Sequence, residues 1–308
     1  MKYTSQNIID SPNHNTIFMT WDFTNNEQMV SVFKRLCALV KNLNNSAQAR
    51  SLEENKASVV LGISHNAWLK LQLPQPLPKE LTVFNPIKGA KHTAVSTPAD
   101  LHLHIRAANH SNCFDIATSI TQLLSTVAVC TNEIHGFRYW DGRSILGFVD
   151  GTENPIGADR VKFGIVGSED KEYEGGSYLF VQKYVHDLKA WNNLPVSEQE
   201  KVIGRSKAHD IEMSDEEKPD NSHSALSNVG DDKKVVRDNM PFGNISTNEM
   251  GTYFIAYART FETVNLMLTR MFIGDPEGNY DRILDFSIAK TGTLFFCPSL
   301  NKLDDFSS

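Results

Sequence analysis

The stretches DLHLHIRA, residues 100–107, and GTYFIAYAR, residues 251–259, decide the predicted fold. In the first, leucine and isoleucine alternate strictly with polar residues, which is typical of a β-strand. The second is rich in aromatic residues and is also expected to be a strand. Each stretch ends near an arginine and leads into a segment with apolar residues at helical spacing, at residues 111–126 and 262–271. The repetition indicates that a strand–helix unit occurs twice in the chain.

The rest of the chain continues this alternation of strands and helices. Strands rich in β-branched and aromatic residues are predicted at residues 15–23, 57–64 and 176–189. A helix is predicted at residues 26–41, and a second begins at Ser197, where Glu200 three residues later indicates a capping box. The order of elements favours an α+β fold with antiparallel sheets and helices on one face.

Composition excludes several functional classes. The chain has 308 residues and a net charge of −7, which argues against a nucleic acid or an anionic membrane as the main partner. The polar N-terminal segment lacks the apolar core of a secretory signal, and no apolar run reaches the length of a membrane span. The four cysteines form neither a CxxC pair nor the CxxCH motif of covalent haem attachment. These features favour a cytoplasmic protein with reduced thiols.

The stretch GFVDGTENP, residues 147–155, contains one carboxylate, Asp150, beside a Gly-Thr pair. Asp-Gly and Asn-Pro both favour turns, so a plain turn is the simplest interpretation of the pattern alone. The alternative is that Asp150 handles protons in a loop held by glycine. His102 and His104, on the same face of a predicted strand, could bind a metal, but no third ligand accompanies them. They are therefore expected on a polar face of the sheet.

Residues 205–239 form a polar insert with many turn-forming residues, which is unusual inside a compact domain unless it has a function. The insert contains His223, which periodicity alone does not distinguish from His209 or His186. Arg237 stands near its end, after two valines. Arg237 could belong to a solvated charge run, or to a short strand that enters the core, where it would need an anionic partner.

Taken together, several stretches resemble the dye-decolorizing peroxidases, and the bacterial intracellular members most of all. The matching stretches are GFVDGTENP (147–155), LPVSEQEKVIGRSK (194–207), PDNSHSALSNV (219–229), VVRDNMPFG (235–243), GTYFIAYAR (251–259) and DRILDFSIAKTGTLFFCPS (281–299). The resemblance covers most of residues 135–300 and is looser in the first half of the chain.

The resemblance implies two tandem ferredoxin-like halves, with antiparallel β-sheets forming a central core and helices outside. Residues 1–134 would form the N-terminal half, and residues 135–308 the C-terminal half that carries haem b, bound non-covalently with one group per chain. The polar insert would wrap the haem and supply its ligand.

The resemblance also implies a set of haem-binding residues. His223 matches the ligand of the haem iron. Asp285 is expected to bind the other ring nitrogen of His223, with Asp281 as the less favoured candidate. The other expected haem contacts are Gly151, Thr152, Glu153, Arg237 and Phe254.

On the other side of the haem, the resemblance implies the catalytic residues. Asp150 matches the acid–base residue that moves a proton between the two oxygens of peroxide. Arg237 would stabilise the negative charge of the peroxide anion, and Asn239 would position peroxide or a water. Tyr139, Trp140 and Tyr257 are candidate electron relays, although aromatic residues more often serve packing.

The implied function is a haem-dependent peroxidase that reduces hydrogen peroxide and oxidises organic electron donors, such as dyes or phenolics, in one-electron steps. The alternatives are a haem carrier or store, and an enzyme that removes iron from haem while leaving the porphyrin intact. The family also implies a homo-oligomer, a dimer or larger, with no nucleic-acid or membrane partner.

Overall fold

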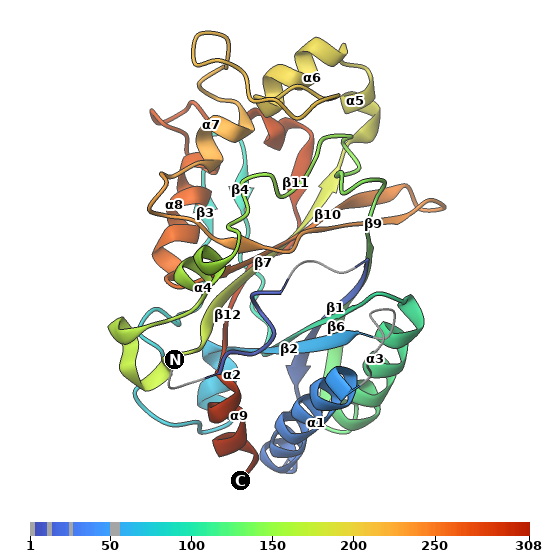
Figure 1. The fold of residues 1–308 in the computed structure, drawn as a ribbon, viewed down its shortest axis with the longest axis vertical. Helices are drawn as coiled ribbons and strands as arrows, with labels where there is room; N and C mark the ends of the chain where they lie inside the picture. Colours follow the sequence, from blue (N-terminus) through green and yellow to red (C-terminus); the bar gives the residue numbers. More distant parts are fainter. Residues whose placement is uncertain (1–3, 11–13, 25–26, 50–55) are drawn as a thin grey trace.

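Eight antiparallel β-strands close into a ring in the computed structural model, which describes residues 4–10, 14–24, 27–49 and 56–308 (Figure 1). The order around the ring is β2 (Ala57–Ser64), β5 (Leu101–Ala107), β1 (Asn15–Phe23), β6 (Ala128–Phe137), β9 (Met240–Asn244), β10 (Glu249–Ala258), β7 (Ser177–His186) and β12 (Thr293–Cys297). The pairing of β12 with β2 completes the circuit. Two short strands, β8 (Val236–Arg237) and β11 (Ser287–Ala289), pair with β10 and β7.

The ring consists of two halves with the same strand order. Numbered along the chain, the four strands of the first half lie in the order 4-1-3-2, as β6, β1, β5 and β2. The strands of the second half repeat this order as β12, β7, β10 and β9. This is the ferredoxin-like arrangement that the family resemblance implied. At both junctions, the fourth strand of one half pairs with the second strand of the other.

Helices cover the outer faces of the two halves. In the first half, α1 (Met29–Ala49) and α3 (His110–Leu124) pack on the strands. In the second half, α8 (Phe261–Phe272) packs on β7 and β10. The connection from β7 to β9 contains three short helices, α5 (Leu188–Asn192), α6 (Val196–Ile203) and α7 (His223–Ser227), which lie above the ring in Figure 1.

The remaining elements are short and lie between or after the ring strands. They are α2 (His65–Lys70), β3 (Ile87–Lys88), β4 (Thr93–Ala94), α4 (Ala158–Gly164), the 3-10 helices η2 (Ser168–Tyr173) and η3 (Arg282–Asp285), and the C-terminal helix α9 (Leu300–Ser307). α9 packs against α1. No described helix combines the length and the apolar character that spanning a bilayer requires.

Both faces of β5 are buried, which corrects one expectation from the sequence. Leu101, Leu103 and Ile105 of β5 belong to the core beneath the helices, as predicted. His102 and His104, on the other face, were expected on a polar surface of the sheet. Instead they lie in the interior of the ring with none of their surface exposed. Alternation along a strand indicates two different faces, but a closed ring buries the second face as well.

Most predicted elements are confirmed, with differences at their ends. The helix expected at residues 26–41 is α1, which runs on to Ala49; Asn26 lies outside the described residues. The capping box at Ser197 is wrong, because α6 begins one residue earlier, after Pro195, and has no side-chain cap. Glu200 accepts a hydrogen bond from the backbone of Lys207 instead.

The predicted boundary between the halves, at residues 134 and 135, falls inside β6. β6 pairs with β1 along most of its length and meets β9 of the second half at Gly136. The division of the chain into two structural halves at that position stays a prediction.

Candidate active site

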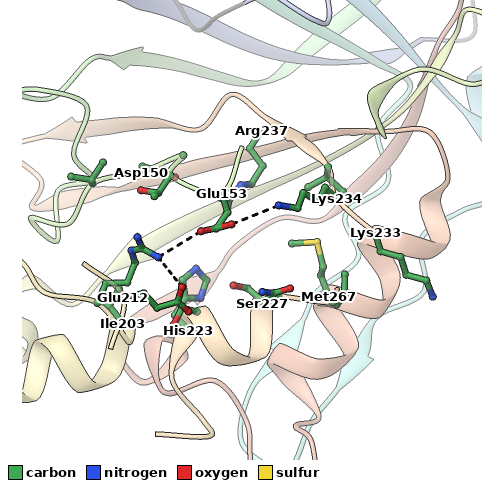
Figure 2. Close-up of a pocket in the computed structure, with 18 of the residues that line it drawn as sticks. Asp150, Glu153, Ile203, Glu212, His223, Ser227, Lys233, Lys234, Arg237 and Met267 are labelled. Carbon is green, nitrogen blue, oxygen red and sulfur yellow. Dashed lines mark ion pairs between the residues drawn. The ribbon is translucent and has the colours of Figure 1, made fainter. Parts of the chain in front are cut away.

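The cavity that concerns function lies in the second half, between α6, α7, α8 and the outer face of β7 and β10. Two adjoining pockets share His223, Asp150 and Arg237 in their walls and so form one continuous space. The cavity volume is about 130 Å³ in one pocket and about 140 Å³ in the other. Figure 2 shows His223 at the lower side of one pocket, with Asp150 and Arg237 at its upper side.

A hydrogen bond to Asp281 fixes the orientation of His223. His223 is the first residue of α7, and its Nδ1 lies 2.7 Å from Oδ2 of Asp281, a residue with no exposed surface. Oδ1 of Asp281 accepts a hydrogen bond from the backbone of Ile283, so the carboxylate is held on both oxygens. A carboxylate can only accept, so Nδ1 carries the proton and donates it. Nε2 is then left with a lone pair for a ligand in the cavity.

The expectation that Asp285 binds His223 is wrong. The Asp285 carboxylate accepts hydrogen bonds from Lys91, at 2.5 Å, and from Tyr280, at 3.1 Å, and lies 3.0 Å from the His92 ring. Asp281 caps the start of η3, whereas Asp285 is its last residue, so the two carboxylates face different neighbours. These contacts lower the pKa of Asp285, although partial burial opposes them.

Asp150 and Asn239 are joined on the upper side of the cavity. The amide nitrogen of Asn239 lies 3.2 Å and 3.4 Å from the two carboxylate oxygens of Asp150. The amide oxygen of Asn239 accepts a hydrogen bond from the backbone of Ile255 at 3.1 Å. Because that bond fixes which end of the amide is the oxygen, Asn239 presents its N–H groups to Asp150.

Of the two alternatives for Arg237, the short strand is the one observed, because Arg237 lies in β8. Its side chain is half-buried in the wall of the cavity. Within the described part of the chain, its guanidinium makes no hydrogen bond or ion pair. A partly buried guanidinium without a protein acceptor can bind an anionic ligand.

Asn154 is an important residue that reasoning from the sequence missed. Its side-chain amide donates to the carbonyl of Arg237 at 2.6 Å and accepts from the backbone N–H of Arg237 at 2.9 Å. These two bonds attach the GFVDGTENP loop to β8, so Asp150 and Arg237 border the same cavity. The signal in the sequence was the Asn-Pro pair, which was assigned only to a turn.

The remaining predicted contact residues border the cavity in different ways. Gly151 has a φ of +88°, and a side chain there would meet only Asn154 at 4.0 Å, so the backbone is open to the cavity. Thr152 donates a hydrogen bond to Asp210. Glu153 lies 3.6 Å from Arg205 and 3.8 Å from Lys234 at the rim. A dashed line in Figure 2 marks its ion pair with Lys234.

The outer face of β10 forms a wall of the cavity through Thr252 and Phe254. Thr252 makes a 2.9 Å hydrogen bond with Nε2 of His186, and Nδ1 of His186 bonds Ser287 at 2.8 Å. Burial lowers the pKa of His186 to about 4. Because both of its ring nitrogens are engaged, His186 is part of the wall, and His223 is the histidine of the described lining that keeps a free nitrogen.

The groups in the cavity fit haem. An imidazole whose Nδ1 is held by a carboxylate is suited to bind iron through Nε2. Apolar side chains suited to a porphyrin line the cavity, including Ile203, Val264, Met267, Leu268 and Met271. Arg237 supplies a positive charge that no described carboxylate pairs, and Gly151 supplies open backbone on the side away from His223.

Comparisons with known proteins match the whole described fold. Two family models cover consecutive parts of the chain: Dyp-type peroxidase, N-terminal, at residues 5–138, and Dyp-type peroxidase, C-terminal, at residues 141–302. The dye-decolorizing peroxidase of Rhodococcus erythropolis is 50% identical over 252 residues, which is 80% of this chain and 74% of that protein.

Two solved structures are similar over nearly the full length. A dye-decolorizing peroxidase from Bacteroides thetaiotaomicron has a TM-score of 0.97 at 48% identity, and the match covers 99% of both chains. A variant of DypB from Rhodococcus jostii, in complex with heme, has a TM-score of 0.93 at 40% identity, and the match covers 98% of each chain.

Proposed function

Because this chain belongs to the Dyp-type peroxidase family, we propose that His223 is the ligand of a haem iron and that Asp150 and Arg237 act together on hydrogen peroxide. The chain is a haem-dependent peroxidase, as its sequence predicted. Haem carriage and the removal of iron from haem are not favoured. The observation that carries the residue assignments is that His223, with its Nδ1 bound to Asp281, borders the same cavity as Asp150 and Arg237.

Haem, when bound, supplies the iron at which peroxide is reduced. Asp150 is the proton carrier. Its carboxylate takes a proton from one peroxide oxygen and gives it to the other, so the O–O bond breaks and water leaves. Asn239 donates to both carboxylate oxygens and keeps the acceptor positions of Asp150 aimed at the cavity. Asn239 is therefore a positioning residue for Asp150.

Arg237 supplies fixed positive charge. Its guanidinium is not neutralised by a described carboxylate, so it stabilises the peroxide anion once Asp150 has taken the proton. Charge that is already in place costs no reorganisation when the bond breaks, and removing such a donor typically slows a reaction by about 10²- to 10³-fold. On the opposite side, the Asp281 carboxylate makes the His223 imidazole a stronger electron donor to iron.

An absorption spectrum of the purified protein with haem, before and after peroxide, tests the assignment of His223. We expect His223→Ala to lose stoichiometric haem binding or to change the iron spectrum. His209→Ala is the matched control, because His209 lies in the same polar insert with its side chain exposed. An unchanged spectrum in His223→Ala would assign the ligand to another residue. A wild-type protein that binds haem, shows no spectral change with peroxide and passes haem to an acceptor would indicate a carrier.

We also infer an organic electron donor, a cytoplasmic location and a homo-oligomer of two or more chains. The four cysteines are free thiols, and three of them are buried, which is typical of a reducing compartment. Oxidation of a dye in the presence of peroxide tests the donor class, and sedimentation of the haem-loaded chain tests the oligomer. A protein that sediments as a monomer at micromolar concentration would contradict the last inference.

A further inference from the structure

Two histidines and a glutamate form a cluster on the outer surface of the first half. His110 is the first residue of α3, and Glu133 and His135 lie on β6. Nδ1 of His135 lies 3.3 Å from Nε2 of His110, and Nε2 of His135 lies 2.7 Å from Oε1 of Glu133. None of the three belongs to the lining of the cavity described above, and the proposed peroxide reaction uses none of them.

The Glu133 carboxylate fixes which nitrogen of His135 carries the proton. A carboxylate only accepts hydrogen bonds, so Nε2 of His135 donates to Glu133. In the neutral ring, Nδ1 of His135 then has a lone pair, and Nδ1 is the nitrogen next to His110. Without a metal, His110 donates its Nε2 proton to this lone pair. With a metal between the rings, His110 carries its proton on Nδ1 instead, and both facing nitrogens become ligands.

The spacing of the two facing nitrogens suits one shared metal ion. Zn²⁺ binds histidine nitrogen at about 2.0–2.1 Å, mostly with tetrahedral geometry. Two nitrogens at that distance and the tetrahedral angle lie roughly 3.3 Å apart. Nε2 of His110 and Nδ1 of His135 have this separation, so an ion needs no rearrangement of the backbone to reach both.

Glu133 gives the pair a feature typical of histidine metal sites. In such sites, a carboxylate on the other ring nitrogen fixes the orientation of the ring and makes the ligand nitrogen more basic. Glu133 has this position on His135. It also supplies negative charge near the N-terminus of α3, where the helix dipole by itself disfavours a cation.

Water completes the coordination of an ion at this place. In the described part of the chain, no third His, Cys, Asp or Glu joins the pair in a metal-binding cluster. His110 is exposed, and 39% of the His135 side chain is exposed, so solvent reaches the site. Closed structural zinc sites have four protein ligands, whereas open sites keep water on the metal. The pair is therefore suited to zinc that exchanges with solution.

The two histidines that the sequence suggested as metal ligands are not available. Nε2 of His102 lies 3.1 Å from the hydroxyl of Tyr253, and Nδ1 of His104 lies 2.8 Å from the hydroxyl of Tyr257. Both histidines lie inside the ring with no exposed surface. A metal-binding pair is instead formed between a helix and a strand, where spacing along the chain gives no signal.

We propose that His110 and His135 form a Zn²⁺ site on the surface of the first half, and that Glu133 orients His135 for it. The bound ion joins the start of α3 to the end of β6. Gly136, the next residue of β6, pairs with Phe242 of β9. The ion therefore stabilises the first half beside its junction with the second, independently of the haem chemistry.

Calorimetric titration of the haem-loaded protein, without an affinity tag, with ZnCl₂ near neutral pH tests the proposal. We expect one ion per chain in the wild type, and loss of this ion in both His110→Ala and His135→Ala. Glu133→Gln should weaken binding by about tenfold. His209→Ala is the control, because His209 is an exposed histidine of the polar insert, and it should bind like the wild type. No binding at millimolar Zn²⁺, or unchanged binding in either ligand variant, would overturn the proposal.

Two further measurements separate this site from unspecific binding. Crystals soaked in ZnCl₂ should show an anomalous peak at the zinc edge, at about 2.0–2.1 Å from Nε2 of His110 and Nδ1 of His135. Zinc should also raise the midpoint of thermal unfolding of the wild type but not of His110→Ala, because an ion that binds only the folded chain stabilises it. Peaks at other residues only, or an equal rise in both proteins, would refute the site. Midpoints without zinc check that the variants remain folded.

Discussion

The two halves share one strand order but differ in how the first and second strands are joined. In the first half, the 21-residue helix α1 makes this connection and packs on the sheet. In the second half, residues 187–239 make it through three short helices and the polar insert. Leu103 on the outer face of β5 is fully buried, whereas Phe254 on the equivalent face of β10 is half-buried and borders the cavity. Replacing one covering helix by an irregular segment is thus how this fold makes room for a cofactor.

The comparison of the two halves predicts that the reaction with peroxide depends on the segment between β7 and β9 and on the loop at residues 147–155. Asp150→Asn and Arg237→Leu should keep haem but slow the reaction with peroxide by about 10²- to 10³-fold, because each removes a group that acts on the peroxide oxygens. Rapid mixing with peroxide, followed by haem absorption, measures the rate. Asp159→Asn, on the exposed surface of α4, is the control. Wild-type rates in both variants would mean that the assigned roles are wrong.

A smaller effect, on haem affinity, should distinguish Asp281 from Asp285, the carboxylates at the two ends of η3. Asp281→Asn should weaken haem binding by about 10- to 100-fold, because the amide no longer supplies negative charge to His223. Asp285→Asn should leave haem affinity unchanged, since its partners are Lys91, His92 and Tyr280. Titration of the haem-free proteins with haem measures both affinities. Equal losses in the two variants would refute the distinction.

Packing should differ between the equivalent strands. Leu103→Ala should lower the free energy of unfolding of the haem-free protein by about 2–5 kcal/mol, since it leaves a void in a filled core. Phe254→Ala should cost about 1–2 kcal/mol less than Leu103→Ala, because its side chain already borders open space. Urea unfolding of the haem-free variants measures both losses. If Phe254→Ala costs as much as Leu103→Ala, the second half is as tightly packed as the first.

The smallest expected effect concerns His186 in the cavity wall. Its pKa is about 4 in the folded protein and about 6.5 in an unfolded chain. Between these values the unfolded chain binds more protons, so stability falls as the pH falls below about 6.5. Between pH 7 and pH 5.5, we expect the free energy of unfolding of His186→Gln to fall by about 1 kcal/mol less than that of the wild type. The pKa values of His102 and His104 are also lowered by burial, so these residues make both the wild type and the variant less stable as the pH falls. If the free energy of unfolding falls equally in the wild type and in His186→Gln, His186 is not the source of this pH dependence.

The sequence allowed the fold to be predicted and proposed site residues that border one cavity, but it did not give the details set by side-chain direction. The strands and helices followed from periodicity, and the family resemblance selected His223, Asp150, Arg237 and Asn239, which all border the cavity. The segment DRILD offers two carboxylates four residues apart, and only the turn of η3 decides which one meets His223. His102 and His104 show the same limit, since an alternating pattern does not reveal that both faces of a strand are covered.

Closure of the ring has a consequence for the way the chain is built. Cut between residues 138 and 141, the chain would give two four-stranded sheets, one ending in β2 and β6 and the other in β9 and β12. Unpaired strands at a sheet edge readily take up strands from other molecules. Each fragment has the two edges needed to pair with a second copy of itself, so a fragment expressed alone is expected to assemble into homodimeric rings or longer aggregates. Joining the two sheets in one polypeptide makes the correct partner always present.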